Sequence, residues 1–189
     1  MNNKVHQIIQ SVFPISKRSS DKINSLVAFK NVQKGEAIVN VEQPNNLEYF
    51  VLEGVQKSFL HNPDGEETTL SFFMSGSILP PFTTRVKDGR SLMNFKALTP
   101  GVLASFNANE FEKLMIEDLE IRNFGNTVLR NELARMVQKE IALASLPSVQ
   151  RLELLRTTYP NLENLVPHTD IASYLGITPI SLSRLRSKR

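Results

Sequence analysis

The sequence contains no cysteine and no tryptophan, and it holds only three histidines in 189 residues. Without cysteine the chain can form no disulfide, no thiolate zinc site and no cysteine-ligated iron–sulfur cluster, and it has no cysteine nucleophile. The histidines, His6, His61 and His168, are far apart and lack the short spacing of metal ligands. We therefore expect no cofactor and no metal.

Long apolar runs are also missing. No segment approaches the roughly 18 apolar residues that a membrane-spanning helix requires. The stretch from Met1 to Phe13 alternates polar and apolar residues and lacks the apolar core of a signal peptide. We expect a cytoplasmic protein with no membrane partner. A hydrophobic content of 41% is still enough for a real core, which argues against wholesale disorder.

The net charge of +3 is unevenly distributed. Residues 1–146 carry 16 Lys and Arg against 16 Asp and Glu, whereas residues 147–189 carry 6 against 3. The whole excess therefore lies at the C-terminal end, where Arg184, Arg186, Lys188 and Arg189 are close together. A basic end on a neutral body suggests a polyanionic partner, although a solvated basic tail explains the charge alone equally well.

Three sequence patterns follow one another along the chain. Residues 3–12 can form a short amphipathic helix. Turn residues then separate short apolar or β-branched runs, which predict an antiparallel β-roll and, with the helices around it, an α+β fold. The turn Asn62-Pro63-Asp64-Gly65 is interpreted as a hairpin rather than a metal loop. The candidate strands are residues 38–41, 49–52, 55–60, 68–74, 92–98 and 102–106.

From residue 108 the pattern becomes helical. Asn109 is a candidate cap for a first helix, and a proline-free stretch of about 30 residues follows, from residue 117 to residue 146. Gly125 within it is either a flaw or a point of close approach. The apolar stripe of this helix exceeds what a small neighbouring domain can cover. We expect a partner helix from a second chain in a two-fold dimer; the alternative is packing on its own domain. The predicted dimer residues are Phe124, Val128, Leu129, Leu133, Met136 and Val137.

Residues 168–186 have the pattern of a helix-turn-helix. Thr169 or Asp170 is expected to cap a first helix, and Gly176 provides the backbone freedom of a tight turn. Thr178 is a favourable cap and Pro179 a favourable first residue for a second helix. The helix-turn-helix therefore places the second helix at the basic end of the chain.

The second helix is suited to the DNA major groove, because no carboxylate occurs from residue 178 to residue 189. Arg184 can donate two hydrogen bonds to guanine, and the other C-terminal cations can contact phosphate. An ordinary helical hairpin is the less favoured alternative. The candidate DNA-binding residues are Thr169, Thr178, Pro179, Ser181, Arg184, Arg186, Lys188 and Arg189.

At these residues the sequence resembles the Crp/Fnr family of bacterial transcription regulators, in particular the short variety common in the Bacteroidetes lineage. The strongest similarity lies in residues 170–178 and 182–186, and residues 34–36, 49–55 and 64–67 resemble landmarks of the family's β-roll. The resemblance covers nearly the whole chain. It implies three units: a cyclic-nucleotide-binding-like β-roll (a jelly roll) at 1–115, a dimerisation helix at 116–146 and a helix-turn-helix at 147–189. The given sequence ends just after the recognition helix, so a complete wing is not expected.

The phosphate-binding cassette that the resemblance implies departs from the family pattern. Nucleotide binders of the family place a Gly-Glu pair before a short helix and an Arg-Ser/Thr-Ala element downstream. Here Pro80-Pro81 replaces the Gly-Glu pair, which removes the ribose contact and two backbone donors. Arg90 and Ser91 match the second element and form the candidate effector pocket, although Arg90 is equally interpreted as a solvated turn cation. We expect weak or no binding of cyclic AMP.

Four phenylalanines are further candidates for an apolar ligand pocket. Burial in the core is the more common role for this residue type. These residues are Phe72, Phe73, Phe82 and Phe95.

The sequence therefore predicts a homodimeric transcription regulator. Its partners are double-stranded DNA with a partly palindromic operator, RNA polymerase, and either an unknown small-molecule effector or none. The alternative is a ligand-binding β-roll whose basic tail docks a protein, which would lack the steep salt dependence of phosphate contacts. An enzyme is not expected, because no metal cluster, nucleophile–base pair or glycine-rich phosphate loop is present.

Overall fold

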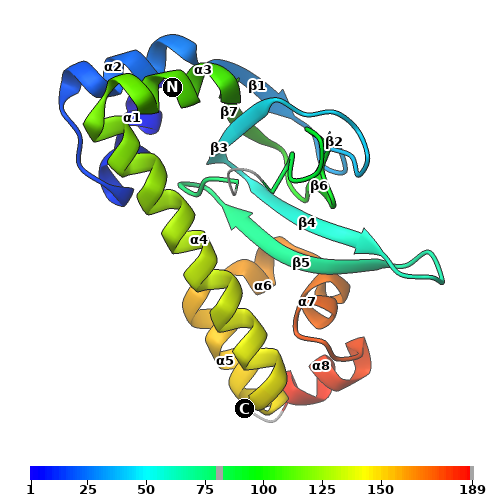
Figure 1. The fold of residues 1–189 in the computed structure, drawn as a ribbon. Helices are drawn as coiled ribbons and strands as arrows, with labels where there is room; N and C mark the ends of the chain where they lie inside the picture. The colour runs from blue at the N-terminus through cyan, green and yellow to red at the C-terminus, as the bar shows by residue number, and fades with distance from the viewer. Residues whose placement is uncertain (80–82, 188–189) are drawn as a thin grey trace.

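The computed structural model describes residues 1–79 and 83–187. Two antiparallel sheets form the β-roll, with strand orders β1-β7-β3 and β2-β6-β4-β5 (Figure 1). This architecture and its helices confirm the predicted α+β class. The strands are β1 (Ala28–Val32), β2 (Ala37–Val39), β3 (Leu47–Glu53), β4 (Val55–His61), β5 (Glu67–Met74), β6 (Asn94–Ala97) and β7 (Gly101–Asn107).

The predicted strands are all present, and only β1 has no counterpart in the sequence pattern. Four of its five residues are exposed, so β1 lacks the apolar alternation that marks a strand. The predicted hairpin between β4 and β5 is confirmed. The Asn62 side chain accepts hydrogen bonds from the backbone N–H groups of Asp64 and Glu66 at 3.0 and 2.8 Å. Local turn chemistry therefore sets the register of these two strands.

Four helices accompany the roll: α1 (Asn2–Val12), α2 (Lys17–Leu26), α3 (Ala108–Glu117) and the long α4 (Leu119–Ser145). Helices α1 to α3 and the first half of α4 form one core with β3 and β7. A second core fills the space between the two sheets, with Val51, Phe73, Phe95 and Leu103 among its members. Among the described residues, no helix has both the length and the apolar character to cross a membrane.

The junction of α3 and α4 differs in one detail from the prediction. Asn107, rather than Asn109, caps α3, because its side chain accepts from the N–H groups of Asn109 and Glu110. The prediction of Asn109 as the cap is therefore wrong by two residues. Gly125 is a point of close approach, since a Cβ atom there would lie 2.8 Å from the Cε atom of Met115 on α3.

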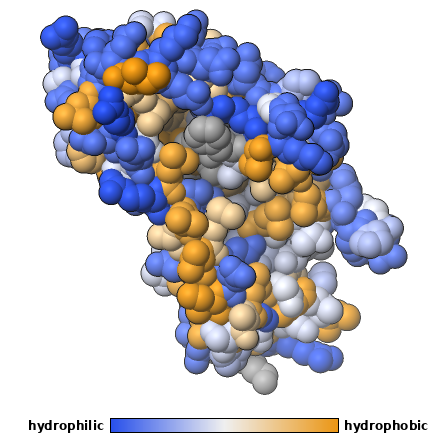
Figure 2. Space-filling model, viewed as in Figure 1, coloured by the Kyte–Doolittle hydropathy of each residue, from blue (hydrophilic) through white to orange (hydrophobic). Residues whose placement is uncertain are grey.

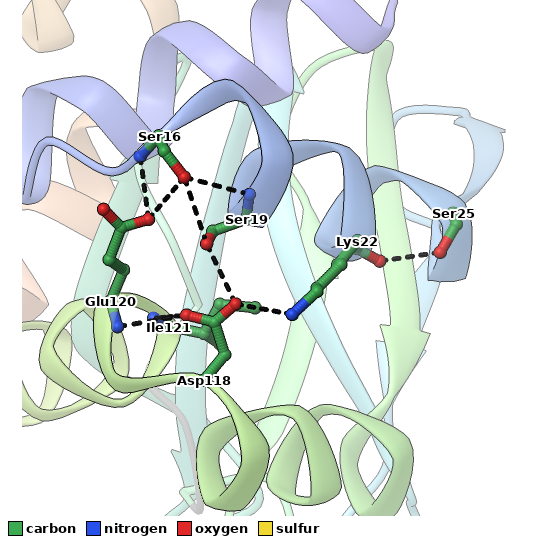
Figure 3. Close-up of polar contacts among 7 residues, drawn as sticks. All are labelled: Ser16, Ser19, Lys22, Ser25, Asp118, Glu120 and Ile121. Carbon is green, nitrogen blue, oxygen red and sulfur yellow. Dashed lines mark hydrogen bonds and ion pairs between the residues drawn. The ribbon is translucent and has the colours of Figure 1, made fainter.

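Polar contacts anchor the N-terminal end of α4 to α2 (Figure 3). Asp118 caps α4 by accepting hydrogen bonds from the first backbone N–H groups of the helix. Its other carboxylate oxygen accepts from Lys22 Nζ at 2.7 Å and from Ser19 Oγ at 2.9 Å. The carboxylate of Glu120 accepts from both the backbone N–H and the hydroxyl of Ser16. The bond from Lys22 is the main reason that the pKa of Asp118 lies below its ordinary value.

Four short helices follow α4: α5 (Ser148–Thr158), α6 (Leu162–Leu165), α7 (His168–Tyr174) and α8 (Pro179–Ser187). Helix α7 packs against β5 (Figure 1), and the other three helices contribute to the same core. Their core is shared with the roll, because Val55 and Phe72 are buried together with Leu155, Ile171 and Leu175. The C-terminal helices are thus seated on the β-roll of the same chain.

Candidate functional site

The turn between α7 and α8 has the predicted form. Ile171, Ala172 and Leu175 are buried, as expected for the inner side of a helix-turn-helix. Gly176 has a φ of +64°, a left-handed conformation that suits glycine. The backbone N–H of Ile177 donates to the carbonyl of Ala172 at 3.0 Å and closes the turn. The structure therefore has the tight turn that the sequence predicts between α7 and α8.

The start of α8 is also as predicted. The hydroxyl of Thr178 accepts a hydrogen bond from the backbone N–H of Ser181 at 3.1 Å, which is the geometry of an N-cap. Pro179 is the first helical residue. Leu182 is buried and anchors the helix on the core that the C-terminal helices share with the roll. These contacts hold the outer side of α8 in a defined orientation.

The outer side of α8 carries Ile180, Ser183, Arg184 and Ser187, all exposed. Ile180 and Ser183 are absent from the predicted site, and Ser181 is half-buried beside Thr178. The helical period supplies the missing signal, because these positions lie opposite the buried Leu182. The side chain of Arg184 makes no ion pair in the part of the chain that the structure describes.

Arg186 differs from Arg184 because it is engaged within the C-terminal helices. Its guanidinium pairs with Glu163 at 3.2 Å and lies 2.9 Å from a ring nitrogen of His168. Glu163 also binds Arg156, and the hydrogen bond from Arg156 lowers the pKa of the Glu163 carboxyl. The charge of Arg186 is thus partly offset. Lys188 and Arg189, the other predicted phosphate contacts, lie outside the described residues.

The start of α7 corrects one expectation. Helix α7 begins at His168, preceded by Pro167, so neither Thr169 nor Asp170 caps it. Thr169 is exposed in the first turn. Asp170 instead accepts a hydrogen bond from Lys57 Nζ of β4 at 2.6 Å. Its carboxylate therefore joins α7 to the roll.

Lys57 is the centre of a buried ionic cluster at this junction. Its side chain is fully buried, and its ammonium also binds Glu67 at 2.6 Å. Lys96 donates to both carboxylate oxygens of Glu67. Burial raises the pKa of Glu67, but the hydrogen bonds from the two lysines outweigh it and leave the pKa below its ordinary value. The cluster fixes the seat of α7, through Asp170, on β4 and β5.

The predicted effector pair, Arg90 and Ser91, lies in a turn. Arg90 is exposed and donates to the backbone carbonyl of Glu42 at 2.6 Å. Ser91 is buried, and its hydroxyl donates to the carbonyl of Met93 at 2.6 Å. Neither side chain lines the cavity described next. Pro80 and Pro81 of the cassette lie outside the described residues.

A cavity of about 700 Å³ lies between the four-stranded sheet and the second half of α4. Phe73 and Phe95, two of the predicted pocket residues, line its sheet side, whereas Phe72 packs in the core shared with the C-terminal helices. Phe82 lies outside the described residues. Helix α4 contributes Met136 and Lys139 among others. The structure therefore locates a candidate ligand site away from Arg90 and Ser91.

The predicted dimer residues of α4 divide into two groups. Phe124 and Val128 are only 2% and 8% exposed and belong to the protomer's own core, so they offer no surface to a second chain. Leu133, Met136 and Val137 are 63%, 49% and 45% exposed. Together with Ile141 they form an apolar stripe along the free side of α4, which Figure 2 shows in orange, while Leu129 is half-buried. The surface that needs cover therefore lies in the second half of the helix.

A family model described as the cyclic nucleotide-binding domain matches residues 29–118, which span β1 to the end of α3. This part of the chain is therefore similar to cyclic nucleotide-binding domains. No curated protein matches the sequence.

Solved structures extend the similarity beyond this domain. FixK2 from Bradyrhizobium japonicum shares 18% identity with a TM-score of 0.73, over 86% of this chain and 83% of that one. The c-di-GMP responsive global regulator CLP of Xanthomonas campestris shares 16% identity with a TM-score of 0.72, over 92% and 91%. A transcriptional regulator assigned to the Crp/Fnr family from Eubacterium rectale shares 16% identity with a TM-score of 0.71, over 94% and 87%. The chain therefore shares the fold of these three proteins, of which CLP and the Eubacterium rectale protein are described as regulators.

Proposed function

We propose that this chain is a DNA-binding transcription regulator that acts as a homodimer and reads DNA with α8. The observation that carries the proposal is the outer side of α8, which is exposed, cationic and free of carboxylates. The capped start of α8 and the buried Leu182 hold this side in place. An acid-free helix presented in this way suits the major groove of DNA.

Each residue of this surface has a chemical role in the proposal. Arg184, whose guanidinium has no ion-pair partner among residues 1–79 and 83–187, donates two hydrogen bonds to guanine, and the exposed Ile180 contacts a thymine methyl group. The hydroxyls of Thr178 and Ser181 bind phosphate beside the N-terminus of α8, near the ring of Pro179. Additional phosphate contacts come from Thr169, Lys188 and Arg189, and from Arg186 to the extent that Glu163 leaves it available.

The stripe of Leu133, Met136, Val137 and Ile141 is the proposed dimer surface. Apolar side chains at helical spacing gain most when a second helix covers them. A two-fold dimer would place two copies of α8 in successive major grooves, about 34 Å apart on one face of a partly palindromic operator. RNA polymerase is the further partner that such a regulator would contact.

The proposed regulator binds cyclic AMP weakly or not at all. Arg90, the candidate for the cyclic phosphate, is exposed and already donates to the carbonyl of Glu42. Arg85 in the same loop is paired with Glu48 and Glu112 at 3.1 and 2.7 Å. Calorimetric titration with cyclic AMP should show no micromolar site, and such a site would contradict this part of the proposal.

The DNA-binding proposal is tested by replacing Arg184. Fluorescence anisotropy on a selected duplex should show that Arg184→Ala loses about 10- to 100-fold of the preference over unrelated DNA. Arg18→Ala, an exposed arginine on α2, is the matched control and should leave binding unchanged. Affinity should also fall steeply with added salt. Equal losses for both variants, or binding that is insensitive to salt, would favour a basic end that docks a protein.

A further inference from the structure

The cavity beside α4 has walls that are mostly apolar. Phe73, Met93 and Phe95 line the side of the roll, and Met136 and Leu143 line the side of the helix. Its volume of about 700 Å³ is typical of sites that enclose a small organic molecule. The polar side chains on the side of the roll are hydroxyls, such as those of Ser58 and Ser71, so this wall holds no charged side chain among the described residues.

Lys139 on α4 is the unusual member of this lining. Its ammonium donates to the backbone carbonyl of Leu70 and lies 4.1 Å from the ring centre of Tyr174. No carboxylate of the described residues forms an ion pair with it. Burial and the neighbouring Arg135 lower the pKa of Lys139 to about 8, which reflects the cost of holding this charge without an anion.

The other charges around the cavity do not supply that anion. Glu132 is bound to Arg135 through both carboxylate oxygens, and Arg135 also donates to the hydroxyl of Ser71 at 2.9 Å. Glu140 is exposed at the rim. Arg151 of α5 lines a small neighbouring pocket together with Lys139 and adds no negative charge there.

The two tyrosines near Lys139 do not supply an anion either. Burial raises the pKa of Tyr174, so its hydroxyl stays neutral at pH 7. The hydroxyl of Tyr159 lies 3.5 Å from the guanidinium of Arg135. Within the described part of the chain, Lys139 therefore remains a cation that lines the cavity without a counter-charge.

We propose that the cavity binds an organic acid with an apolar body, whose carboxylate pairs with Lys139 and whose hydrocarbon or aromatic part lies against Phe73 and Phe95. This inference assigns an effector class to the regulator proposed above. It rests on that proposed function only for its regulatory meaning, because binding of the acid is measured without DNA.

The charge and the lining separate an acid from other ligand classes. A neutral apolar molecule would remove water from the ammonium of Lys139 without replacing it, which costs free energy. A carboxylate supplies the missing partner in a low-dielectric site, where a charge-assisted hydrogen bond is strong. A cyclic nucleotide would place a ribose and a polar base in a lining made mostly of aromatic, aliphatic and thioether side chains, which offer few hydrogen bonds. The walls therefore favour an apolar body with one anionic end.

The position of Lys139 also connects this site to the DNA-binding end. Its ammonium lies over the ring of Tyr174, the last residue of α7, and next to Leu70 of β5. An acid that draws the ammonium into the cavity would change both contacts. Ligand binding is thus coupled to the seat of the helix-turn-helix on the roll.

The test is isothermal titration calorimetry of the full chain with dodecanoate and with dodecan-1-ol, its neutral counterpart. Dodecanoate should bind and dodecan-1-ol should bind at least about 10-fold more weakly. Lys139→Met, which keeps an apolar stem, should lose about 10- to 100-fold in affinity for dodecanoate but not for the alcohol. Lys139→Arg should retain binding because it keeps the charge, and Lys113→Met on the exposed side of α3 should behave as the wild type.

The pH dependence gives an independent readout. Lys139 must be protonated to pair with the acid, so dodecanoate affinity should fall as the pH rises above about 8 in the wild type. The same affinity should be insensitive to pH in Lys139→Met. The raised pKa values of Arg135 and Tyr174 keep the charge states of these two neighbours unchanged near this pH.

Three results would overturn the inference. The first is no binding of dodecanoate below about 1 mM. The second is equal affinity for the acid and the alcohol. The third is unchanged dodecanoate binding by Lys139→Met. Tight binding of cyclic AMP in place of dodecanoate would also contradict it, and none of these results depends on DNA binding.

Discussion

Replacement of Lys57 by methionine should cost this protein several kilocalories per mole of stability. The side chain of Lys57 is fully buried, and its ammonium binds Glu67 and Asp170 at 2.6 Å each. Lys57→Met would leave the carboxylate of Asp170, which is only 14% exposed, without a partner. Breaking a buried pair from one side typically costs 3–5 kcal/mol, and we expect about 3 kcal/mol because Glu67 keeps its bond to Lys96.

The assay is urea unfolding followed by far-UV circular dichroism. Asp170→Asn in the Lys57→Met background removes the orphaned charge, so the double variant should recover most of the loss. Lys17→Met is the matched control, because Lys17 and Asp21 form an exposed pair with side chains 85% and 58% accessible. Its loss should stay within about 0.5 kcal/mol.

Two results would refute this reasoning. A loss below about 1 kcal/mol for Lys57→Met would mean that the cluster does not hold α7 on the roll. Additive losses from the Lys57 and Asp170 substitutions would mean that the two side chains do not interact.

Two further predictions concern α4. Asp118→Ala removes the cap of α4 and the bond to Lys22, so thermal unfolding should show a loss of about 1–2 kcal/mol that the exposed control Asp21→Ala lacks. The pKa of Asp118 is lower in the folded protein than its ordinary value of 3.8, so this stabilisation is present above pH 3.8 and disappears as the pH falls through the lower folded pKa. An unchanged difference in stability between the two variants at low pH would contradict this. Leu133→Glu should convert the proposed dimer to a monomer in sedimentation velocity, whereas Val149→Glu on α5, which is also exposed, should not; a dimeric Leu133→Glu variant would place the interface elsewhere.

Most of the β-roll could be predicted because each strand has a local sequence pattern. Short apolar runs and turn residues such as Asn62 and Gly65 carry the information within a few positions. Helix α2 could not be predicted in this way. Its buried residues include Ser19 and Ser20, so the segment shows no apolar stripe although its inner side is packed.

The site shows where such reasoning reaches its limit. The cap at Thr178 and the buried Leu182 follow from local chemistry, and the structure has both. The helical period of α4 indicates which side is apolar but not whether the same chain or a second chain covers that side. The prediction therefore assigns Phe124 and Val128 to the dimer surface, whereas the structure packs them in the core of their own chain.

No sequence pattern marks Lys139 as a ligand-binding residue. Its candidate role follows from its surroundings, which β5, α4 and α7 form and in which no carboxylate of the described residues pairs with it. A single lysine in a helix is ordinarily a solvated charge. Only the packing of distant segments turns it into a candidate ligand-binding group.

The most direct test of the central claim is selection of random DNA duplexes on the purified full chain, followed by sequencing. The account predicts enrichment of a two-fold symmetric motif whose half-sites lie about one helical turn, or 34 Å, apart. The Arg184→Ala variant should fail to enrich the same motif. An absence of enrichment, or a motif that the variant selects equally well, would contradict DNA recognition by α8.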